Sequence, residues 1–161
     1  MSLGLKTTLS TIVGLAVGLG LSMSAPTSAH ASAFSDADKA VEYRQQSLQL
    51  IRENFAYMAG MVRGEIDYDG EMFEQRAIAL QHLSHVPWDG FRYAGENHRG
   101  SGDALPAVWE NWSDFESRSE QLQEDAKALA EAAASHELSD VRNQFMATAR
   151  NCQQCHDRYR D

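Results

Sequence analysis

Two cysteines and a histidine stand close together near the end of the chain, in the order Cys152-Gln-Gln-Cys155-His156. This C-x-x-C-H spacing is typical of c-type haem attachment, in which two thiols bind the haem covalently and the imidazole binds its iron. On a helix, positions i, i+3 and i+4 share one face. The spacing therefore predicts one haem c per chain, attached through Cys152 and Cys155, with His156 as the iron ligand.

A redox dithiol and half of a zinc site are the alternatives for the same residues. The chain has two cysteines in all, whereas a structural zinc site needs four close ligands. A thioredoxin-like C-x-x-C lies near a βαβ pattern, and no strand pattern precedes Cys152. The sequence therefore favours haem attachment over both alternatives.

The N-terminal residues have the three regions of a secretory signal. Lys6 is followed by an apolar run over residues 11–23 and then by small residues, with cleavage expected after Ala31 or Ala33. An uncleaved membrane anchor is the alternative, but the run is short and rich in glycine for a membrane span. We therefore expect a signal peptide that is removed on export.

Cleavage of residues 1–31 would leave residues 32–161, which make one domain of ordinary size. The mature chain would hold 13 basic and 23 acidic residues, a formal charge of −10. Such an acidic surface argues against nucleic acid and anionic lipid as partners and permits a basic redox partner. An exported haem domain without a further apolar span belongs in the periplasm, free of the membrane.

The first part of this domain has the periodicity of a helix that packs lengthwise on another. Ser35, with Asp38 three residues later, predicts the N-cap of this helix, and Gly64 marks its end. Its stripe advances in alternating steps of three and four. The members of the stripe are Val41, Arg44, Leu48, Ile51, Phe55, Met58 and Val62.

Arg44 is the charged member of this stripe, and a charge on an apolar face needs a partner. Two interpretations stay open for it. The guanidinium can snorkel beyond the end of the apolar seam, or it can pair with a buried anion such as a haem propionate. A haem in the protein would favour the second interpretation.

Three further helices follow in the same way. Apolar spacing predicts a second helix over residues 71–84 and a third over residues 106–134, which is bent near Trp112. Ser139 is the expected N-cap of a fourth helix, whose apolar face carries Cys152 and His156.

The glycines between residues 87 and 103 indicate one long connecting loop. The connections on either side of it are short. The predicted fold class is therefore all-α: an antiparallel four-helix bundle with one long loop between its second and third helices.

With these landmarks the chain resembles the cytochrome c′ family, the class II c-type cytochromes, over essentially the whole mature sequence. The segments that carry the resemblance are Val41-Glu-Tyr43-Arg44-Gln45 with Leu48, Leu83-Ser-His-Val-Pro87-Trp88, Leu105-Pro106-x-x-Trp109 and Cys152-x-x-Cys155-His156-Asp157-x-Tyr159-Arg160.

The resemblance implies a five-coordinate iron with His156 as its only strong ligand. It implies that Leu48 covers the vacant face and that Arg160 guards the face on the His156 side. It also implies that residues of the first helix, and one residue ahead of the third, lie near the haem edge. These residues are Arg44, Gln45 and Asp103.

The function implied by the resemblance is the binding of diatomic gases, nitric oxide and carbon monoxide, with nitric oxide handling as a possible role. Family members are commonly homodimers through their first two helices. The alternative function is periplasmic electron transfer, which favours a second strong ligand such as the methionine that related four-helix cytochromes present. Met58 is ten residues beyond Leu48, about 15 Å along a helix, and is too far to serve the same iron.

Histidines are the other source of a second iron ligand, but surface positions are the favoured interpretation because none lies on the first-helix stripe. They are His82, His85, His98 and His136. No motif places an acid–base pair or a nucleophile, so we do not expect an enzyme.

Overall fold

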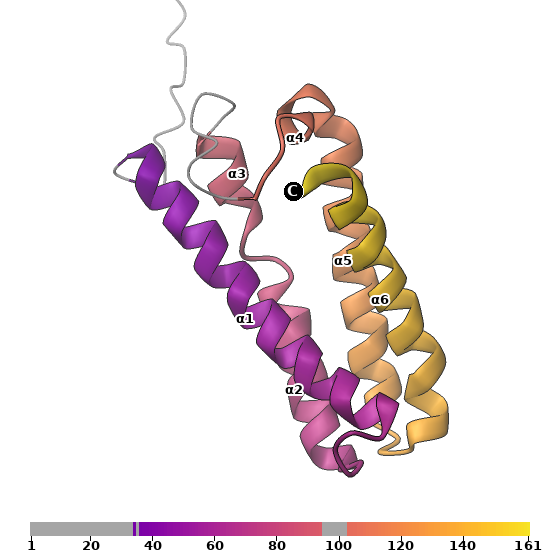
Figure 1. The fold of residues 1–161 in the computed structure, drawn as a ribbon. Helices are drawn as coiled ribbons and strands as arrows, with labels where there is room; N and C mark the ends of the chain where they lie inside the picture. The colour runs from indigo at the N-terminus through magenta and orange to yellow at the C-terminus, as the bar shows by residue number, and fades with distance from the viewer. Residues whose placement is uncertain (1–33, 35, 95–102) are drawn as a thin grey trace, which may run out of the picture. The chain divides into compact units, whose positions relative to one another are not determined.

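The computed structural model of the protein describes residues 34, 36–94 and 103–161. The expected signal peptide and Ser35 lie outside the described residues. In this part of the chain the regular elements are helices: α1 (Ala37–Arg63), α2 (Gly70–Leu83), α3 (Trp88–Ala94), α4 (Ala107–Glu110), α5 (Trp112–Ala133) and α6 (Leu138–Tyr159). The four long ones form the bundle (Figure 1), which confirms the predicted all-α four-helix fold.

The bundle is built from neighbouring pairs of helices. α1 packs on α2, α2 on α5, and α5 on α6, while α3 packs against α1. None of the helices in the described part of the chain has the length and hydropathy that a bilayer crossing requires.

The ends of α1 are closed by local signals. The side chain of Asp36 accepts a hydrogen bond from the backbone N–H of Lys39 at 2.9 Å, so Asp36 is the N-cap. The prediction had put this cap one residue earlier, at Ser35. At the other end Gly64 has φ of 75°, the left-handed conformation that glycine adopts at little cost and that commonly ends a helix.

Two later boundaries also differ from the prediction. The N-cap of α6 is Glu137, and Ser139, the predicted cap, lies inside the first turn. The predicted third helix is two helices, α4 and α5, separated by Asn111 with φ of −126° and ψ of 44°. The bend expected near Trp112 is therefore a full break in the helix one residue earlier.

The predicted loop over residues 87–103 was wrong in its first half, where the chain forms α3. Gly90 had been interpreted as a loop residue, but it lies where α3 meets α1. A Cβ atom at this position would lie 2.6 Å from the carbonyl oxygen of Ala40 and 2.7 Å from Cβ of Arg44. The glycine therefore permits two helices to approach closely.

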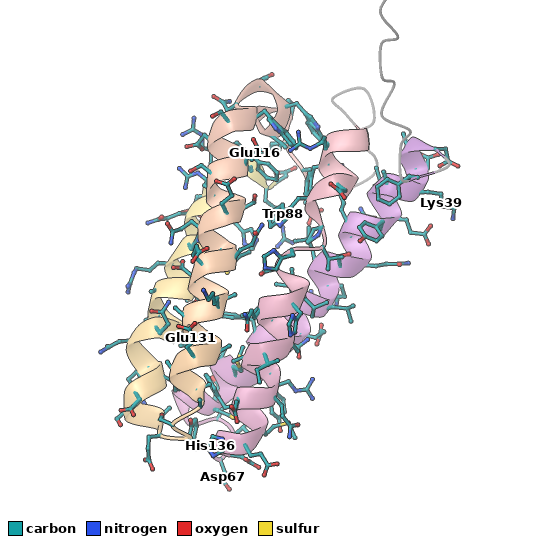
Figure 2. The ribbon with its side chains drawn as sticks, turned by 180° about the vertical axis from the view of Figure 1, so that it is seen from behind. Lys39, Asp67, Trp88, Glu116, Glu131 and His136 are labelled. Carbon is teal, nitrogen blue, oxygen red and sulfur yellow. The ribbon has the colours of Figure 1, made fainter. Side chains whose placement is uncertain are left out.

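The bundle has a large core and a smaller one. The large core joins α1, α2, α5 and α6 through residues such as Met58, Phe73 and Leu129. The smaller core joins α3, α4, α5 and the end of α6 through Phe91, Val108, Phe115 and Tyr159. Figure 2 shows Trp88 and Glu116 toward the end of the bundle with the smaller core, and Asp67 and His136 at the opposite end.

Candidate haem site

The three side chains of the C-x-x-C-H motif lie in the last two turns of α6 and face one cavity. Cys152, Cys155 and His156 all line this cavity, which has a volume of about 660 Å³. The volume is in the range of roughly 300–1,000 Å³ that small-molecule and cofactor sites occupy. The helical spacing therefore does what the sequence predicted: it brings both thiols and the imidazole to one face.

α1 supplies the facing wall. Leu48, Ile51 and Phe55 line the cavity from this helix, and Leu48 packs against both hydrophobic cores. Phe115 and Val108 extend the apolar lining. The surface of this cavity is mostly apolar, and arginine side chains are among its lining residues. Such a cavity suits a flat, mostly hydrocarbon cofactor that carries acidic groups.

Arg44 lies at the α3 end of this cavity and is 2 % exposed. Its guanidinium carbon lies 4.5 Å from the ring centroid of Phe91 and 5.5 Å from that of Trp109. Nη1 also donates a hydrogen bond of 3.3 Å to the carbonyl oxygen of Gly90. Burial lowers the pKa of Arg44, and the snorkelling interpretation is wrong because the charged group points inward.

Asp103 and Arg160 lie together at the edge of the cavity, which both residues line. Nη2 and Nε of Arg160 lie 2.9 and 3.1 Å from Oδ2 of Asp103. The backbones also pair, since the N–H of Leu105 donates to the carbonyl of Tyr159 at 2.9 Å. The sequence suggested each residue separately, and the structure adds the ion pair between them. Gln45 is exposed and lines the same cavity from α1.

The surroundings of the motif withdraw its side chains partly from water and so shift their protonation, although His156 keeps an exposed surface. Burial raises the pKa of the Cys152 thiol to about 11 and also raises the pKa of Cys155. Burial, with help from Arg160, lowers the pKa of His156. At neutral pH the imidazole is therefore neutral, the form that binds iron, and the cysteines are thiols rather than the thiolates of a redox dithiol.

The zinc interpretation lacks ligands. Within residues 34, 36–94 and 103–161 there is no group of three histidine, cysteine or acidic side chains that could hold a metal ion. The donor set, the apolar walls and the cavity volume fit a haem instead, with His156 able to bind its iron and the two thiols able to attach it.

The other side chains considered as a second iron ligand do not line this cavity where the structure describes them. Met58 is fully buried in the large core and is not among the residues that line the cavity. His82, His85 and His136 are exposed, as expected of surface histidines, and the cavity lining does not include them. His98 lies outside the described residues.

The sequence reasoning missed several residues at the site, among them Arg52, Arg118 and Asp114. Arg52 and Arg118 line the cavity, and Asp114 accepts hydrogen bonds from Arg118 and from Tyr159, a cavity residue. One signal was available: Asp114 and Arg118 are four residues apart, the spacing of an ion pair on one helix face. Their relation to Tyr159, 45 residues later, had no local signal.

Comparison with known proteins agrees with this geometry. The family model described as Cytochrome C′ matches residues 39–160. A cytochrome c′ from Halomonas halodenitrificans is 33 % identical over 130 residues, which are 78 % of this chain and 98 % of that protein. The solved structure of cytochrome c prime from Shewanella frigidimarina is 36 % identical, covers 80 % of this chain and 98 % of its own, and has a TM-score of 0.75.

A further solved structure is a variant of cytochrome c prime from Alcaligenes xylosoxidans in complex with nitric oxide. It is 31 % identical, covers 80 % of this chain and 99 % of its own, and has a TM-score of 0.71. The family match spans most of the chain, and these relatives are matched over almost their whole length. This chain therefore belongs to the cytochrome c′ family of haem proteins.

Proposed function

We propose that this protein is a periplasmic c-type haem protein that binds diatomic gases, nitric oxide and carbon monoxide, at an iron whose only strong protein ligand is His156. The observation that carries this proposal is the composition of the cavity walls. One wall has two thiols and an imidazole, and the facing wall has the aliphatic side chain of Leu48. A gas-binding protein, rather than an enzyme, is the function that this pairing supports.

Each cavity residue has a role in this proposal. Cys152 and Cys155 attach the haem to α6, and His156 presents its imidazole to the iron. A haem in this cavity supplies an iron with one open coordination position. Leu48 on the facing wall would cover that position, so an incoming gas would have to displace a packed side chain, and the leucine itself offers no hydrogen-bond donor.

The polar residues at the edge of the cavity suit the haem carboxylates. Arg44 carries a buried positive charge, and Gln45 adds an amide at the exposed edge. Arg160 is held beside His156 by Asp103. We assign Arg44 and Gln45 to the haem propionates, with Asp103 near the same edge, and Arg160 to the face on the His156 side.

Electron transfer is the weaker alternative. A carrier gains from two strong axial ligands, because the iron site then changes little between oxidation states. The part of the chain that the structure describes offers no methionine and no second histidine among the cavity residues. The nitric oxide complex of the relative from Alcaligenes xylosoxidans also favours gas binding.

Export and assembly complete the proposal. Residues 1–31 serve as a signal peptide, and residues 32–161 function in the periplasm. The protein is a homodimer through α1 and α2, because apolar side chains on these helices are exposed: Tyr43, Leu50 and Tyr57 on α1 and Ile78 on α2, with exposed fractions between 37 and 53 %. Sedimentation equilibrium that gives a monomer at micromolar concentration would contradict this part of the proposal.

The ferrous spectrum of the purified protein tests the central claim. Expression in a host that attaches haem c should give a chain whose mass includes one haem after acid extraction. Its reduced form should have a five-coordinate, high-spin absorption and resonance Raman spectrum. A mass equal to the bare chain would overturn covalent attachment, and a six-coordinate low-spin spectrum would favour the electron carrier.

A further inference from the structure

Asp114, in the first turn of α5, accepts hydrogen bonds from side chains of two helices, α5 and α6. Nε of Arg118 donates to its Oδ2 at 2.7 Å, one turn along α5. The hydroxyl of Tyr159, on α6, donates to the same oxygen. Arg118 and Tyr159 hold the pKa of Asp114 below its usual range, so the acceptor is an ionised carboxylate at neutral pH.

Tyr159 connects this carboxylate to the haem cavity. The residue is 3 % exposed, and its ring meets the edge of Phe115 at a centroid distance of 5.3 Å and an angle of 87°. Both rings line the cavity. Tyr159 follows Cys155 by four residues and His156 by three, so it stands one helical turn from both on the same side of α6.

The last turn of a helix is normally its loosest part, because its carbonyl groups lack partners within the helix. α6 ends at Tyr159, so His156 lies in that last turn. Any fraying there would move the imidazole. Two side-chain contacts oppose fraying, the hydrogen bond from Tyr159 to Asp114 and the ion pair between Asp103 and Arg160. The backbone hydrogen bond from the Leu105 N–H to the Tyr159 carbonyl opposes it as well.

The two contacts differ in strength. The side chains of Arg160 and Asp103 are 50 and 61 % exposed, and exposed ion pairs stabilise weakly. Tyr159 is buried, and its hydroxyl donates a hydrogen bond to an ionised carboxylate that is 41 % exposed, less than either side chain of the ion pair. Hydrogen bonds with a charged partner are about twice as strong as neutral ones. Of the two side-chain contacts at the end of α6, the one with Asp114 is therefore the stronger.

We infer that Asp114 is a positioning residue for the iron ligand: through Tyr159 it holds the last turn of α6, and with it the imidazole of His156, in place against the iron. The inference rests on the proposed role of His156 as the iron ligand. Arg118 supports it by orienting the carboxylate from the other side.

Resonance Raman spectroscopy of the ferrous holoprotein tests the inference through the iron–histidine stretching band. Tyr159→Phe keeps the buried ring and removes the donor, whereas Asp114→Ala removes the acceptor. Each should broaden the band and shift it to lower frequency. Each should also raise the pH at which acid breaks the iron–histidine bond. The double variant should shift the band no further than the larger single shift, because both changes remove the same hydrogen bond between Tyr159 and Asp114.

Thr148→Val is the matched control. Thr148 is fully buried on α6, and its hydroxyl reaches the Asp125 carbonyl on α5 at 3.4 Å and the Gln144 carbonyl at 3.0 Å. The residue does not line the cavity. Its valine variant should lower the Tm and leave the iron–histidine band as in the unmodified protein.

Two outcomes would overturn the inference, and they are distinguishable. If Tyr159→Phe and Asp114→Ala lower the Tm as Thr148→Val does but leave the band unmoved, the contact is structural only and the proposed gas-binding function stands. If the unmodified ferrous protein is six-coordinate and low-spin, the proposed function fails first and the inference fails with it.

Discussion

At the scale of single residues, the proposed gas binding makes Leu48 the residue on which selectivity depends. This side chain is half-buried and packs against both hydrophobic cores while it faces the cavity wall that holds His156. A ligand that approaches the iron from the α1 side must therefore disturb packing in two places. Bond strength and size, rather than hydrogen bonding to Leu48, then decide which gas binds.

Leu48→Ala should speed the association of carbon monoxide with the ferrous protein by a factor of ten or more. The reason is that a displacement cost of about 1.4 kcal/mol corresponds to a tenfold rate. Stopped-flow or flash photolysis measures the rate. Leu50→Ala is the control, since Leu50 is on the same helix, is 53 % exposed and does not line the cavity. An equal rate in Leu48→Ala and the unmodified protein would refute the displacement mechanism.

At the scale of elements, α3 forms one side of the cavity only because it lies very close to α1. Gly90 makes this approach possible, and its carbonyl accepts the hydrogen bond from Arg44. Phe91, the next residue, lies under the guanidinium. The short helix therefore holds the one buried arginine of the described residues that faces the cavity.

Gly90→Ala should destabilise the protein, although alanine is the better helix former by up to about 1 kcal/mol. The new methyl group would lie 2.6 Å from a backbone oxygen of α1, and overpacking of this kind costs typically about 1–3 kcal/mol. Denaturant unfolding measures the effect. Asp89→Ala, at the exposed neighbouring position in α3, should be close to neutral; a stability of Gly90→Ala equal to or above that of the unmodified protein would contradict the prediction.

A second prediction for the elements concerns the start of α2. The side chain of Asp69 accepts a hydrogen bond of 3.0 Å from the backbone N–H of Met72 and caps the helix. Asp69→Ala should lower the free energy of unfolding by about 0.5–2 kcal/mol. Asp67→Ala removes an exposed acid two residues before the N-cap and should have a smaller effect. Equal losses of stability in the two variants would argue that charge, not capping, matters.

At the scale of the whole domain, an ion pair joins α2 to the turn between α5 and α6, at the end of the bundle opposite the smaller core. His136, in the turn between α5 and α6, lies with Nε2 2.7 Å from Oε2 of Glu74 on α2. His136 also has a positive φ of 60°, which few residues other than glycine adopt. Gly70 packs closely here, since a Cβ atom there would lie 2.5 Å from the His136 carbonyl oxygen.

This pair makes stability depend on pH. Glu74 raises the pKa of His136 above its ordinary value of 6.5. A group whose folded pKa is raised stabilises the fold fully below its unfolded pKa, and loses that contribution as the pH rises through the folded pKa.

The Tm difference between the unmodified protein and Glu74→Gln should therefore be largest below about pH 6.5 and should vanish at alkaline pH. Thermal unfolding at a series of pH values measures this difference. Glu71→Gln, a nearby acid on the same helix with a lesser influence on His136, is the control. A Tm difference that is independent of pH would show that the pair contributes through packing alone.

The sequence by itself determined the features that depend on residues close together in the chain. The three side chains of the haem motif share a face because helical periodicity puts i, i+3 and i+4 together, and Cys152, Cys155 and His156 do line one cavity. The four long helices follow from the spacing of apolar residues in the same way. Leu48 was found because it lies on the first-helix stripe and matches a family landmark.

The tertiary structure decided the contacts between residues that are distant in the chain. The glycine-rich composition around Gly90 is typical of a loop, but in the structure this segment forms α3, which packs closely against α1. The sequence left two interpretations open for Arg44. In the structure its guanidinium is buried against the rings of Phe91 and Trp109, which lie 47 and 65 positions further along the chain. The hydrogen bond from Tyr159 to Asp114 exists because the end of α6 packs beside the start of α5. No local sequence pattern predicts this contact between the two helices.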